Sequence, residues 1–492
     1  MREQSTFCYN SLIPPFTFNN MTKQLPADFI QQTTSLLGTS EAASLFEALT
    51  ETSASTSVRR NPKKDATSLH ERFSETSTAP VAWCAEGAYL ESRPSFILDP
   101  ALHAGAYYVQ EAASMFLEQA IHQILSHTTP QRVLDLCAAP GGKSTLWRSL
   151  LPDGALLVAN EPMHQRAEVL AENLTKWGHP DIVVTNAYPE AFQGLKGFFD
   201  VIGADVPCSG EGMFRKDDVA ISEWSLHNVM TCADRQWQIV CDIWDCLREG
   251  GFMVYSTCTF NREENENMVA KICKQLGAEV VPLAVEATWN IHTLSEDGKV
   301  LNAAEANNGM YHFYPHKTRG EGLFLCLLHK TSEAPSLKPK KDKAQRSGKP
   351  STAPDVQKSL RWLNQPADFT LMAMSDSEWA AVRKSLADDI ARIHKNIKCL
   401  TCGIPLAELR GRKLVPLHGL ALSQERAPQA FPTCEVDVET AIAYLRREAI
   451  NIDAPLGWVI ISHKGLSLGF VNNLGNRANN QYPQAWRIRK SV

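Results

Sequence analysis

Two cysteines that each follow a predicted strand are the residues of this chain best suited to covalent chemistry. Cys208 lies in the segment Asp-Val-Pro-Cys-Ser-Gly (205–210) and Cys258 in Tyr-Ser-Thr-Cys-Thr (255–259), and a short apolar run precedes each segment. A thiolate is a strong nucleophile near neutral pH, above all where its pKa is lowered. We expect both thiols to face one cleft at the ends of the two strands, beside the carboxyl group of Asp205.

A glycine-rich turn upstream indicates what else this cleft binds. Residues 135–144 read Asp-Leu-Cys-Ala-Ala-Pro-Gly-Gly-Lys-Ser and lie between a predicted strand and a predicted helix, where glycine lets the backbone approach a ligand. A phosphate-binding loop would need glycine at position 137, which is cysteine, and the dinucleotide pattern G-x-G-x-x-G is absent. Glu161 ends the next predicted strand, near where an acidic residue binds ribose hydroxyls. The pattern favours a cofactor that carries an adenosine but no phosphates.

The middle of the chain alternates strand-like and helix-like segments. Strands are predicted at 133–136, 155–160 and 182–184, and helices at 142–150 and 163–176. This alternation is typical of an α/β domain, in which a parallel sheet carries helices on both faces.

The composition suits a multidomain protein. The chain has 492 residues, of which 44% are apolar, so two to four domains are expected. The net charge of −5 gives no indication of nucleic-acid binding. A local basic face is still compatible with this net charge, because net charge averages over the whole surface. The start does not resemble a signal peptide and no long apolar run occurs. We expect a cytoplasmic protein, without a membrane span, whose thirteen cysteines are reduced.

Changes in composition suggest the domain boundaries. Residues 21–50 have a helix-like apolar pattern, and a linker rich in Pro, Ser and Lys precedes the last globular part, whose end predicts short strands with turns. The expected parts are a start-site extension (1–20), an N-terminal module (21–95), the cofactor-binding domain (96–330), a flexible linker (331–358), an intermediate region (359–435) and a β-rich C-terminal domain (436–492).

The motifs together resemble a known family. The segments 137–143, 205–210 and 256–258, in this order, are similar to motifs of the RNA cytosine-C5 methyltransferases of the NOL1/NOP2/Sun family. The stretch His-Ala-Gly-Ala-Tyr-Tyr-Val-Gln-Glu (103–111) also looks like that family, and the C-terminal stretch 469–480 resembles its subgroup for bacterial small-subunit ribosomal RNA. The resemblance runs from about residue 21 to the C-terminus, except for the linker.

Two departures from the family pattern stand out. Val206 replaces the usual alanine before Pro-Cys. The stretch Thr-Asn-Ala-Tyr-Pro (185–189) lacks the acidic residue that members commonly use to bind the adenine amino group. Asn186 and Tyr188 are the candidates to replace it.

The resemblance implies a fold, a cofactor and a division of roles. The fold is a Rossmann-like methyltransferase domain with a small N-terminal α/β module and a C-terminal region similar to a PUA domain, and the methyl donor is S-adenosylmethionine. The N-terminal module (21–95) would bind RNA or substrate, and the PUA-like domain (436–492) would bind RNA. Cys258 would attack C6 of the cytosine, Cys208 would assist release, and Asp205 would hold the ring. From the residues alone the two cysteines are interchangeable, and the Pro-Cys motif of DNA cytosine methyltransferases would favour Cys208. The implied cofactor-binding residues are Cys137, Ala138, Ala139, Pro140, Gly141, Gly142, Lys143, Glu161 and Asp205.

The motifs do not name the RNA. The resemblance favours a cytosine of 16S ribosomal RNA, in the free RNA or in the small ribosomal subunit, as the target of a monomeric enzyme. The alternatives are a transfer-RNA cytosine or a catalytically silent RNA-binding assembly factor. The presence of both cysteines and Asp205 argues against a catalytically silent protein. A third alternative, a nicotinamide dehydrogenase, is disfavoured because the chain lacks the dinucleotide-binding motif G-x-G-x-x-G.

Several further segments have two interpretations each. Lys143 either points into the cleft or is a solvated first-turn lysine. The pair Arg215–Lys216 either contacts RNA phosphates or belongs to a solvated loop. The pair Cys399 and Cys402 has zinc-like spacing, but one pair cannot close a tetrahedral site, so we expect packing and no metal.

Two more groups complete the sequence-based hypotheses. Basic residues cluster near Tyr482 and Trp486, which suits an RNA-binding surface or a charged domain edge. These basic residues are Arg477, Arg487, Arg489 and Lys490. The run 263–266 (Glu-Glu-Asn-Glu) is interpreted as the acidic first turn of a helix, with a structural rather than a catalytic role.

Overall fold

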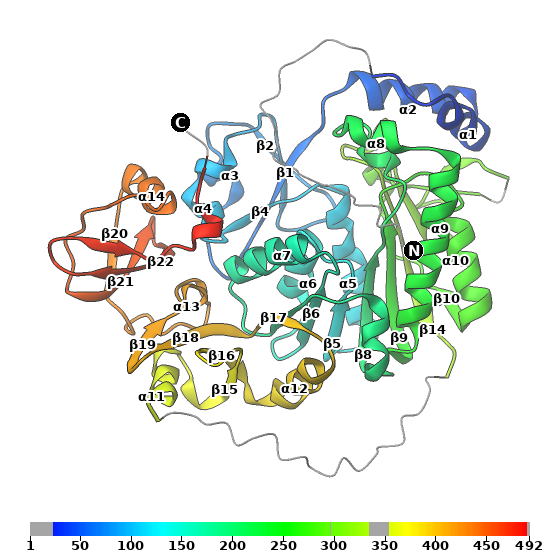
Figure 1. The fold of residues 1–492 in the computed structure, drawn as a ribbon. Coiled ribbons are helices and arrows are strands. Elements are labelled where there is room, and N and C mark those ends of the chain that lie inside the picture. The colour runs from blue at the N-terminus through cyan, green and yellow to red at the C-terminus, as the bar shows by residue number, and fades with distance from the viewer. Residues whose placement is uncertain (1–22, 296, 334–353, 490–492) are drawn as a thin grey trace, which may run out of the picture.

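The strands of the described residues form four sheets, and the largest sheet carries the predicted catalytic segments. The computed structural model describes residues 23–295, 297–333 and 354–489 (Figure 1). The expected extension (1–20), most of the expected linker and Lys490 lie outside these residues.

The centre of the main sheet is parallel. Strand β5 (Arg132–Asp135) pairs with β6 (Leu156–Asn160) on one side and with β8 (Phe199–Asp205) on the other. Beyond these, β6 pairs with β7 (Ile182–Thr185) and β8 pairs with β9 (Leu247–Thr257). The chain therefore turns to opposite sides of β5, and ligands of such sheets bind at the carboxyl ends of the strands beside this switch point.

Antiparallel strands extend the sheet at both edges. β17, from the C-terminal half of the chain, pairs with β7, and β14 pairs with β9. The added strands are β10 (Ala278–Val280), β11 (His292–Leu294), β12 (Val300–Asn302), β13 (Met310–Phe313), β14 (Leu323–Lys330) and β17 (Cys399–Cys402).

Helices cover both faces of this sheet because neighbouring strand residues point to opposite sides. Val133 is part of the core beneath one set of helices, and Leu134 of the core beneath the other. The first set is α5 (Leu117–His127), α6 (Gly142–Leu150) and α7 (His164–Trp177); the second is α9 (Leu226–Trp244), α10 (Glu266–Ile272) and α12 (Ala387–Asn396). The predicted α/β architecture is confirmed.

The N-terminal part consists of two helices and a small antiparallel sheet. The single helical pattern predicted over 21–50 is interrupted at Gly38, whose φ of 80° is a conformation that side-chain-bearing residues rarely adopt. The elements are α1 (Ala27–Leu37), α2 (Thr39–Glu51), α3 (Leu69–Arg72), α4 (Pro100–His103), and a sheet in the order β2 (Thr78–Pro80), β3 (Gly87–Leu90), β1 (Thr56–Arg60) and β4 (Tyr107–Val109). This sheet therefore continues beyond residue 95.

Helix α1 packs on the segment that follows Cys208. The ring of Phe29 lies 5.0 Å from that of Phe214 and 5.5 Å from that of Trp224, measured between centroids. The short helix α8 (Asp218–Glu223) belongs to the same contact region. The N-terminal helices thus cover one side of the Cys208 segment.

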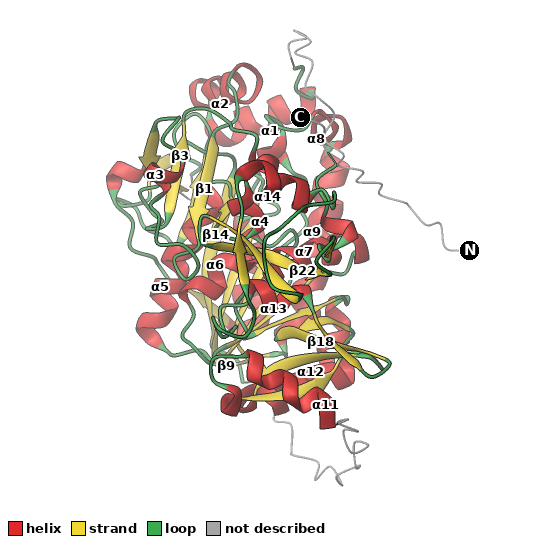
Figure 2. Cartoon of the chain, turned by 90° about the vertical axis from the view of Figure 1, so that its left-hand side faces the viewer, coloured by secondary structure: helices red, strands yellow, loops and turns green. Residues whose placement is uncertain are grey.

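The C-terminal half forms two further sheets (Figure 2). The first contains β15 (Phe369–Ala373), β16 (Glu378–Arg383), β18 (Ile404–Arg410) and β19 (Lys413–Pro416), with α11 (Pro354–Gln357) and α13 (His418–Leu422); the second contains β20 (Thr433–Glu435), β21 (Gly457–His463), β22 (Leu466–Asn473) and β23 (Ala478–Asn480), with α14 (Val438–Leu445). The second sheet is the predicted β-rich end of the chain.

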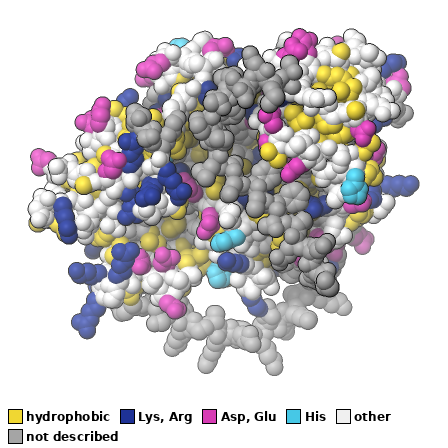
Figure 3. Space-filling model, turned by 45° about the horizontal axis from the view of Figure 1, so that its top comes forward, with side chains coloured by type: hydrophobic (Ala, Val, Ile, Leu, Met, Phe, Trp, Pro, Cys, Tyr) yellow, Lys and Arg dark blue, Asp and Glu magenta, His cyan; other side chains and the backbone are white. Residues whose placement is uncertain are grey.

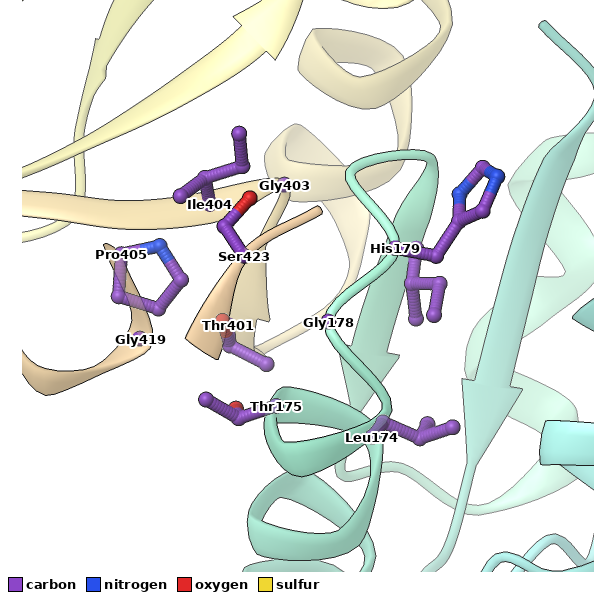
Figure 4. Close-up of a pocket in the computed structure, with 11 residues that line it drawn as sticks. Leu174, Thr175, Gly178, His179, Thr401, Gly403, Ile404, Pro405, Gly419 and Ser423 are labelled. Atoms are coloured by element: carbon purple, nitrogen blue, oxygen red, sulfur yellow. The ribbon is translucent and has the colours of Figure 1, made fainter. Parts of the chain in front are cut away.

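A small cavity marks the seam between the main sheet and the first C-terminal sheet (Figure 4). Hydrogen bonds close the seam on both sides of it: Gly403 N–H donates to Ile182 O (2.8 Å) and Gln424 N–H donates to Gly178 O (2.9 Å). The cavity lies beside the amino end of β7. The predicted site lies at the opposite, carboxyl ends of the parallel strands.

Candidate active site

The two predicted thiols are in direct contact. Strands β8 and β9 pair in parallel with Asp205 opposite Ser256. Cys208 and Cys258 therefore both lie just beyond the carboxyl ends of these strands, three and two residues after this pair. Their sulfur atoms lie 3.0 Å apart. The backbone N–H of Cys258 also donates to Cys208 Sγ, at 3.3 Å. Both cysteines are free and half-buried, which leaves them accessible from the cleft.

The environment favours the protonated form of Cys208. The hydrogen bond to Cys258, together with burial and the negative charge of Glu264, raises the pKa of the Cys208 thiol well above its usual value. At neutral pH Cys208 therefore keeps its proton and can donate it to the sulfur of Cys258.

Asp205 is held by two donors. Lys143 Nζ donates to its Oδ2 at 2.9 Å and Ser256 Oγ donates to its Oδ1 at 2.7 Å. Burial opposes the charge of Lys143, but the charge and hydrogen bond of Asp205 outweigh it, so the pKa of Lys143 is raised. Lys143 therefore points towards Asp205 in the cleft, and the interpretation as a solvated lysine is excluded.

The glycine-rich turn joins the end of β5 to the start of α6 at this same edge. Gly141 has a φ of 116°, which favours glycine, and Gly142 opens the helix. A Cβ atom at Gly142 would lie 3.4 Å from the ring of Tyr108. Below the turn, Ser144 Oγ donates to Asp135 at 2.6 Å, and burial raises the pKa of Asp135 to about 7.

Glu161 stands at the end of β6, the next strand. Its carboxyl group is buried, accepts a hydrogen bond from Met163 N–H at 3.0 Å and lies 3.3 Å from Arg166. Burial raises its pKa. A carboxyl group here, beside the glycine-rich turn, is the acceptor that the two hydroxyls of a ribose require. The residues at this edge thus fit an adenosine-bearing cofactor.

Asn186, one of the two candidates for adenine contact, ties two strands together. Its Nδ2 donates to the backbone oxygens of Glu161 and Pro162, at 2.9 Å each, and its N–H donates to Lys398 O at 3.0 Å. The side chain of Tyr188 is largely exposed. Asn186 therefore fixes the backbone beside Glu161, with the support of the segment before β17.

Sequence reasoning missed a buried acidic pair beneath the cysteines. Helix α10 begins at Glu266, so the interpretation of 263–266 as its first turn is wrong for Glu264, which is fully buried before the helix. Glu211 is also buried and accepts from the backbone N–H groups of Phe260 and Asn261 at 2.7 and 3.1 Å. The available signal was an acidic residue shortly after each cysteine.

The basic pair after Cys208 divides into one structural and one exposed residue. The guanidinium of Arg215 is buried and pairs with Glu321, with Nε–Oε2 and Nη2–Oε1 distances of 2.9 and 2.8 Å. It also donates to Gly320 O at 2.6 Å. Lys216 is about one-third exposed. Arg215 is thus not available to RNA phosphates.

Basic side chains gather on the C-terminal domain. In Figure 3 Lys and Arg cluster on the left-hand half of the face shown, the side on which the second C-terminal sheet lies in Figure 1. The exposed basic residues of this domain are Arg447, Lys464, Arg477, Arg487 and Arg489. They form a local basic surface on an acidic protein.

Cys399 and Cys402 lie on β17 and pair with Thr185 and Val183 of β7. Within the described ranges, no group of three or more His, Cys, Asp or Glu side chains is arranged to hold a metal ion. In the same ranges no helix is long and apolar enough to cross a membrane.

Comparison with known proteins decides the family. The model of the 16S rRNA methyltransferase RsmB/F matches residues 122–329, that of the N-terminal domain of RsmF matches 25–112, and that of the RsmF PUA domain matches 431–488. The ribosomal RNA small subunit methyltransferase F of Psychromonas ingrahamii is 31% identical over 435 residues, which cover 82% of this chain and 84% of that protein. The chain belongs to the RsmB/F family of 16S rRNA methyltransferases.

Other relatives agree with this assignment. The protein of the same name from Aliivibrio fischeri is 31% identical over 423 residues, covering 82% of this chain and 85% of its own. Among solved structures, a methyltransferase homologue from Pyrococcus horikoshii has a TM-score of 0.51 at 24% identity, covering 61% of this chain and 93% of its own. NSun6 from Pyrococcus horikoshii, solved with SFG, has a TM-score of 0.52 at 19% identity, covering 64% and 100%. These two likenesses concern the fold.

Membership of the RsmB/F family confirms several predictions. The chain is a methyltransferase of 16S ribosomal RNA, its methyl donor is S-adenosylmethionine, and its C-terminal domain is an RNA-binding PUA domain. The Rossmann-like fold class with its PUA domain is likewise confirmed.

Proposed function

We propose that this enzyme methylates C5 of a cytosine in 16S ribosomal RNA through a covalent bond between Cys258 Sγ and C6 of the base. The observation that supports this most directly is the contact of the Cys208 and Cys258 sulfurs, 3.0 Å apart, at the sheet edge that also carries Asp205. A single thiol would suffice for addition, but two thiols in contact suit a reaction in which one bond to sulfur must form and later break.

The first step activates the ring. Cytosine C5 is a weak nucleophile, and addition of the Cys258 thiolate to C6 converts the ring into an enamine whose C5 can attack a methyl group. Negative charge develops towards N3, and the carboxyl group of Asp205 would hydrogen-bond this side of the base and its exocyclic amine. Lys143 places a positive charge against the same carboxyl group, 2.9 Å away.

The methyl group comes from S-adenosylmethionine. The residues that would hold this donor are the turn 137–143, Glu161 and Asp205. The backbone of the turn would approach it closely, and the carboxyl group of Glu161 would accept hydrogen bonds from the ribose hydroxyls.

The last step releases the product. The proton on C5 leaves and the Cys258–C6 bond breaks. Cys208 gives its thiol proton to the departing sulfur of Cys258, and the resulting Cys208 thiolate takes the C5 proton. The proton released by the overall reaction then resides on Cys258. The raised pKa of Cys208 suits it to this acid role, which supports Cys258 as the nucleophile and agrees with the family resemblance.

The substrate assignment is tested by mapping methylcytosine. Bisulfite sequencing of 16S ribosomal RNA and transfer RNA from a strain without the gene is expected to show one lost 16S mark, restored by the wild-type gene and not by Cys258→Ala. Loss of a transfer-RNA mark with all 16S marks intact would contradict the proposal. Methylation of free 16S RNA and of isolated small subunits by the purified enzyme separates the two forms of the substrate.

A further inference from the structure

Glu264 connects the segments that carry the two cysteines. Its Oε2 accepts from Ser209 N–H (2.9 Å) and from Gln236 Nε2 (2.7 Å), and its Oε1 accepts from Ser209 Oγ (2.5 Å) and Asn261 Nδ2 (2.8 Å). Ser209 directly follows Cys208, and Asn261 follows Cys258 by three residues. One carboxyl group thus holds both segments.

This carboxyl group has neutral partners. Among the described residues no Lys, Arg or His forms an ion pair with Glu264, which is fully buried. A buried carboxyl group without a cation is costly, and the four hydrogen bonds offset this cost only while all four donors stay in place. The arrangement therefore tolerates little movement of either segment.

Neighbouring groups make the connection rigid. Gln236, whose side chain is fully buried on α9, also donates to Pro207 O at 2.9 Å and accepts from the hydroxyl group of Tyr255 at 3.0 Å. Gly212 N–H donates to the backbone oxygen of Cys258 at 2.8 Å. The positions of both cysteines are thus set by contacts to the same buried residue, Glu264.

We propose that Glu264 is a positioning residue that sets the separation between the sulfur atoms of Cys208 and Cys258. The effect of this separation on catalysis rests on the proposed function, in which Cys208 transfers a proton to the sulfur of Cys258. Such a transfer requires the two sulfur atoms to lie within hydrogen-bond distance. A misplacement of about 1 Å can cost about a hundredfold in rate.

The separation can be measured without RNA. The dithiol oxidant diamide takes two electrons and two protons from a pair of adjacent thiols and leaves a disulfide, and mapping of the linked peptides by mass spectrometry gives the rate for Cys208–Cys258. In Glu264→Gln one carboxylate oxygen becomes an NH₂ group, which cannot accept a hydrogen bond from the two donors that face it. The segments that carry Cys208 and Cys258 should therefore shift. We expect at least a tenfold slower cross-link. Glu263→Gln, at the neighbouring half-buried position, is the matched control and is expected to cross-link at the wild-type rate.

Turnover provides the second measurement. Glu264→Gln is expected to lower kcat by about ten- to a hundredfold, with KM for RNA and the Kd for S-adenosylhomocysteine within about twofold of wild type, whereas a general loss of structure would change all three. Glu264→Asp, which keeps the charge on a shorter arm, is expected to be intermediate and serves if the glutamine variant does not fold. Wild-type cross-linking in both variants, or slow cross-linking with unchanged kcat, would overturn the proposal. The cross-linking comparison holds even if the wild-type enzyme methylates a different RNA.

Discussion

The sulfur atoms of Cys208 and Cys258 lie 3.0 Å apart, although 50 residues separate them in the chain. Parallel pairing of β8 and β9, with Asp205 opposite Ser256, brings them together at one sheet edge. This contact is the geometric basis for the proposal that the two thiols act as a pair.

Replacement of each cysteine is expected to fail at a different step. Cys258→Ala removes the nucleophile, so methylation should be lost entirely, as measured by methyl transfer from labelled S-adenosylmethionine. Cys208→Ala leaves attack intact but removes the proton donor for release, so a covalent protein–RNA adduct should accumulate and survive denaturing gel electrophoresis.

The double variant, Cys208→Ala with Cys258→Ala, is the control for the adduct and should form none. Free turnover by Cys258→Ala would refute its role as nucleophile. An adduct in Cys258→Ala and not in Cys208→Ala would reverse the two roles.

Lys143→Met is expected to slow the reaction with little change in RNA affinity. The variant leaves Asp205 without the ammonium group 2.9 Å from its Oδ2, and a positioned acid or base contributes about 10² to 10⁴ in rate. Single-turnover methyl transfer measures the effect. Lys196→Met removes a comparable pair with Asp245 (2.8 Å) before the start of β8 and should react at the wild-type rate. Equal rates for the two variants would show that the charge of Lys143 is dispensable.

The stability of the domain should depend on pH through Asp135. Burial raises the pKa of this carboxyl group from 3.8 to about 7, so its stabilising protonated form is fully present below about pH 4 and is lost as the pH rises through 7. Asp135→Asn keeps the acceptor for Ser144 without ionising. Its free energy of unfolding, measured by urea titration, should therefore rise relative to wild type between about pH 4 and 7, by up to about 1.4 kcal/mol per pH unit, and the difference should level off above pH 7.

The control for this pH effect is Asp153→Asn, at a largely exposed carboxyl group. Its urea midpoint should differ from wild type by a constant amount across the same range. A constant difference for Asp135→Asn as well would contradict the raised pKa.

Arg215→Ala should lower the free energy of unfolding of the protein rather than its affinity for RNA phosphates. The variant removes the two-point guanidinium contact from the buried Glu321 and leaves only Lys216, whose Nζ lies 3.5 Å from Glu321 Oε1. Breaking a buried pair costs up to about 3–5 kcal/mol in the free energy of unfolding. Denaturant unfolding measures the loss. Lys216→Ala, at the more exposed neighbour, should change stability by less than about 1 kcal/mol. The salt dependence of RNA binding should stay the same in Arg215→Ala; a smaller slope would show that Arg215 contacts phosphate after all.

Local patterns in the sequence were sufficient for the elements around the site. The strands that end at Asp135, Asn160 and Asp205 were predictable because buried parallel strands are short apolar runs. The turn after Asp135 identified an adenosine-bearing cofactor, because the presence and absence of glycines at fixed positions is a local property. Both reactive cysteines were also evident from the strand ends that they follow.

What only the tertiary structure decided concerns groups far apart in the chain. The sequence by itself left Lys143 and Arg215 each with two interpretations, and the fold directed Lys143 to Asp205 and buried Arg215 against Glu321. It also placed Glu264 between the two cysteine segments, where the sequence pattern indicated a helix. The physical reason is the same each time: the direction and protonation of a polar side chain depend on partners brought near by strand pairing and packing, and no local pattern specifies them.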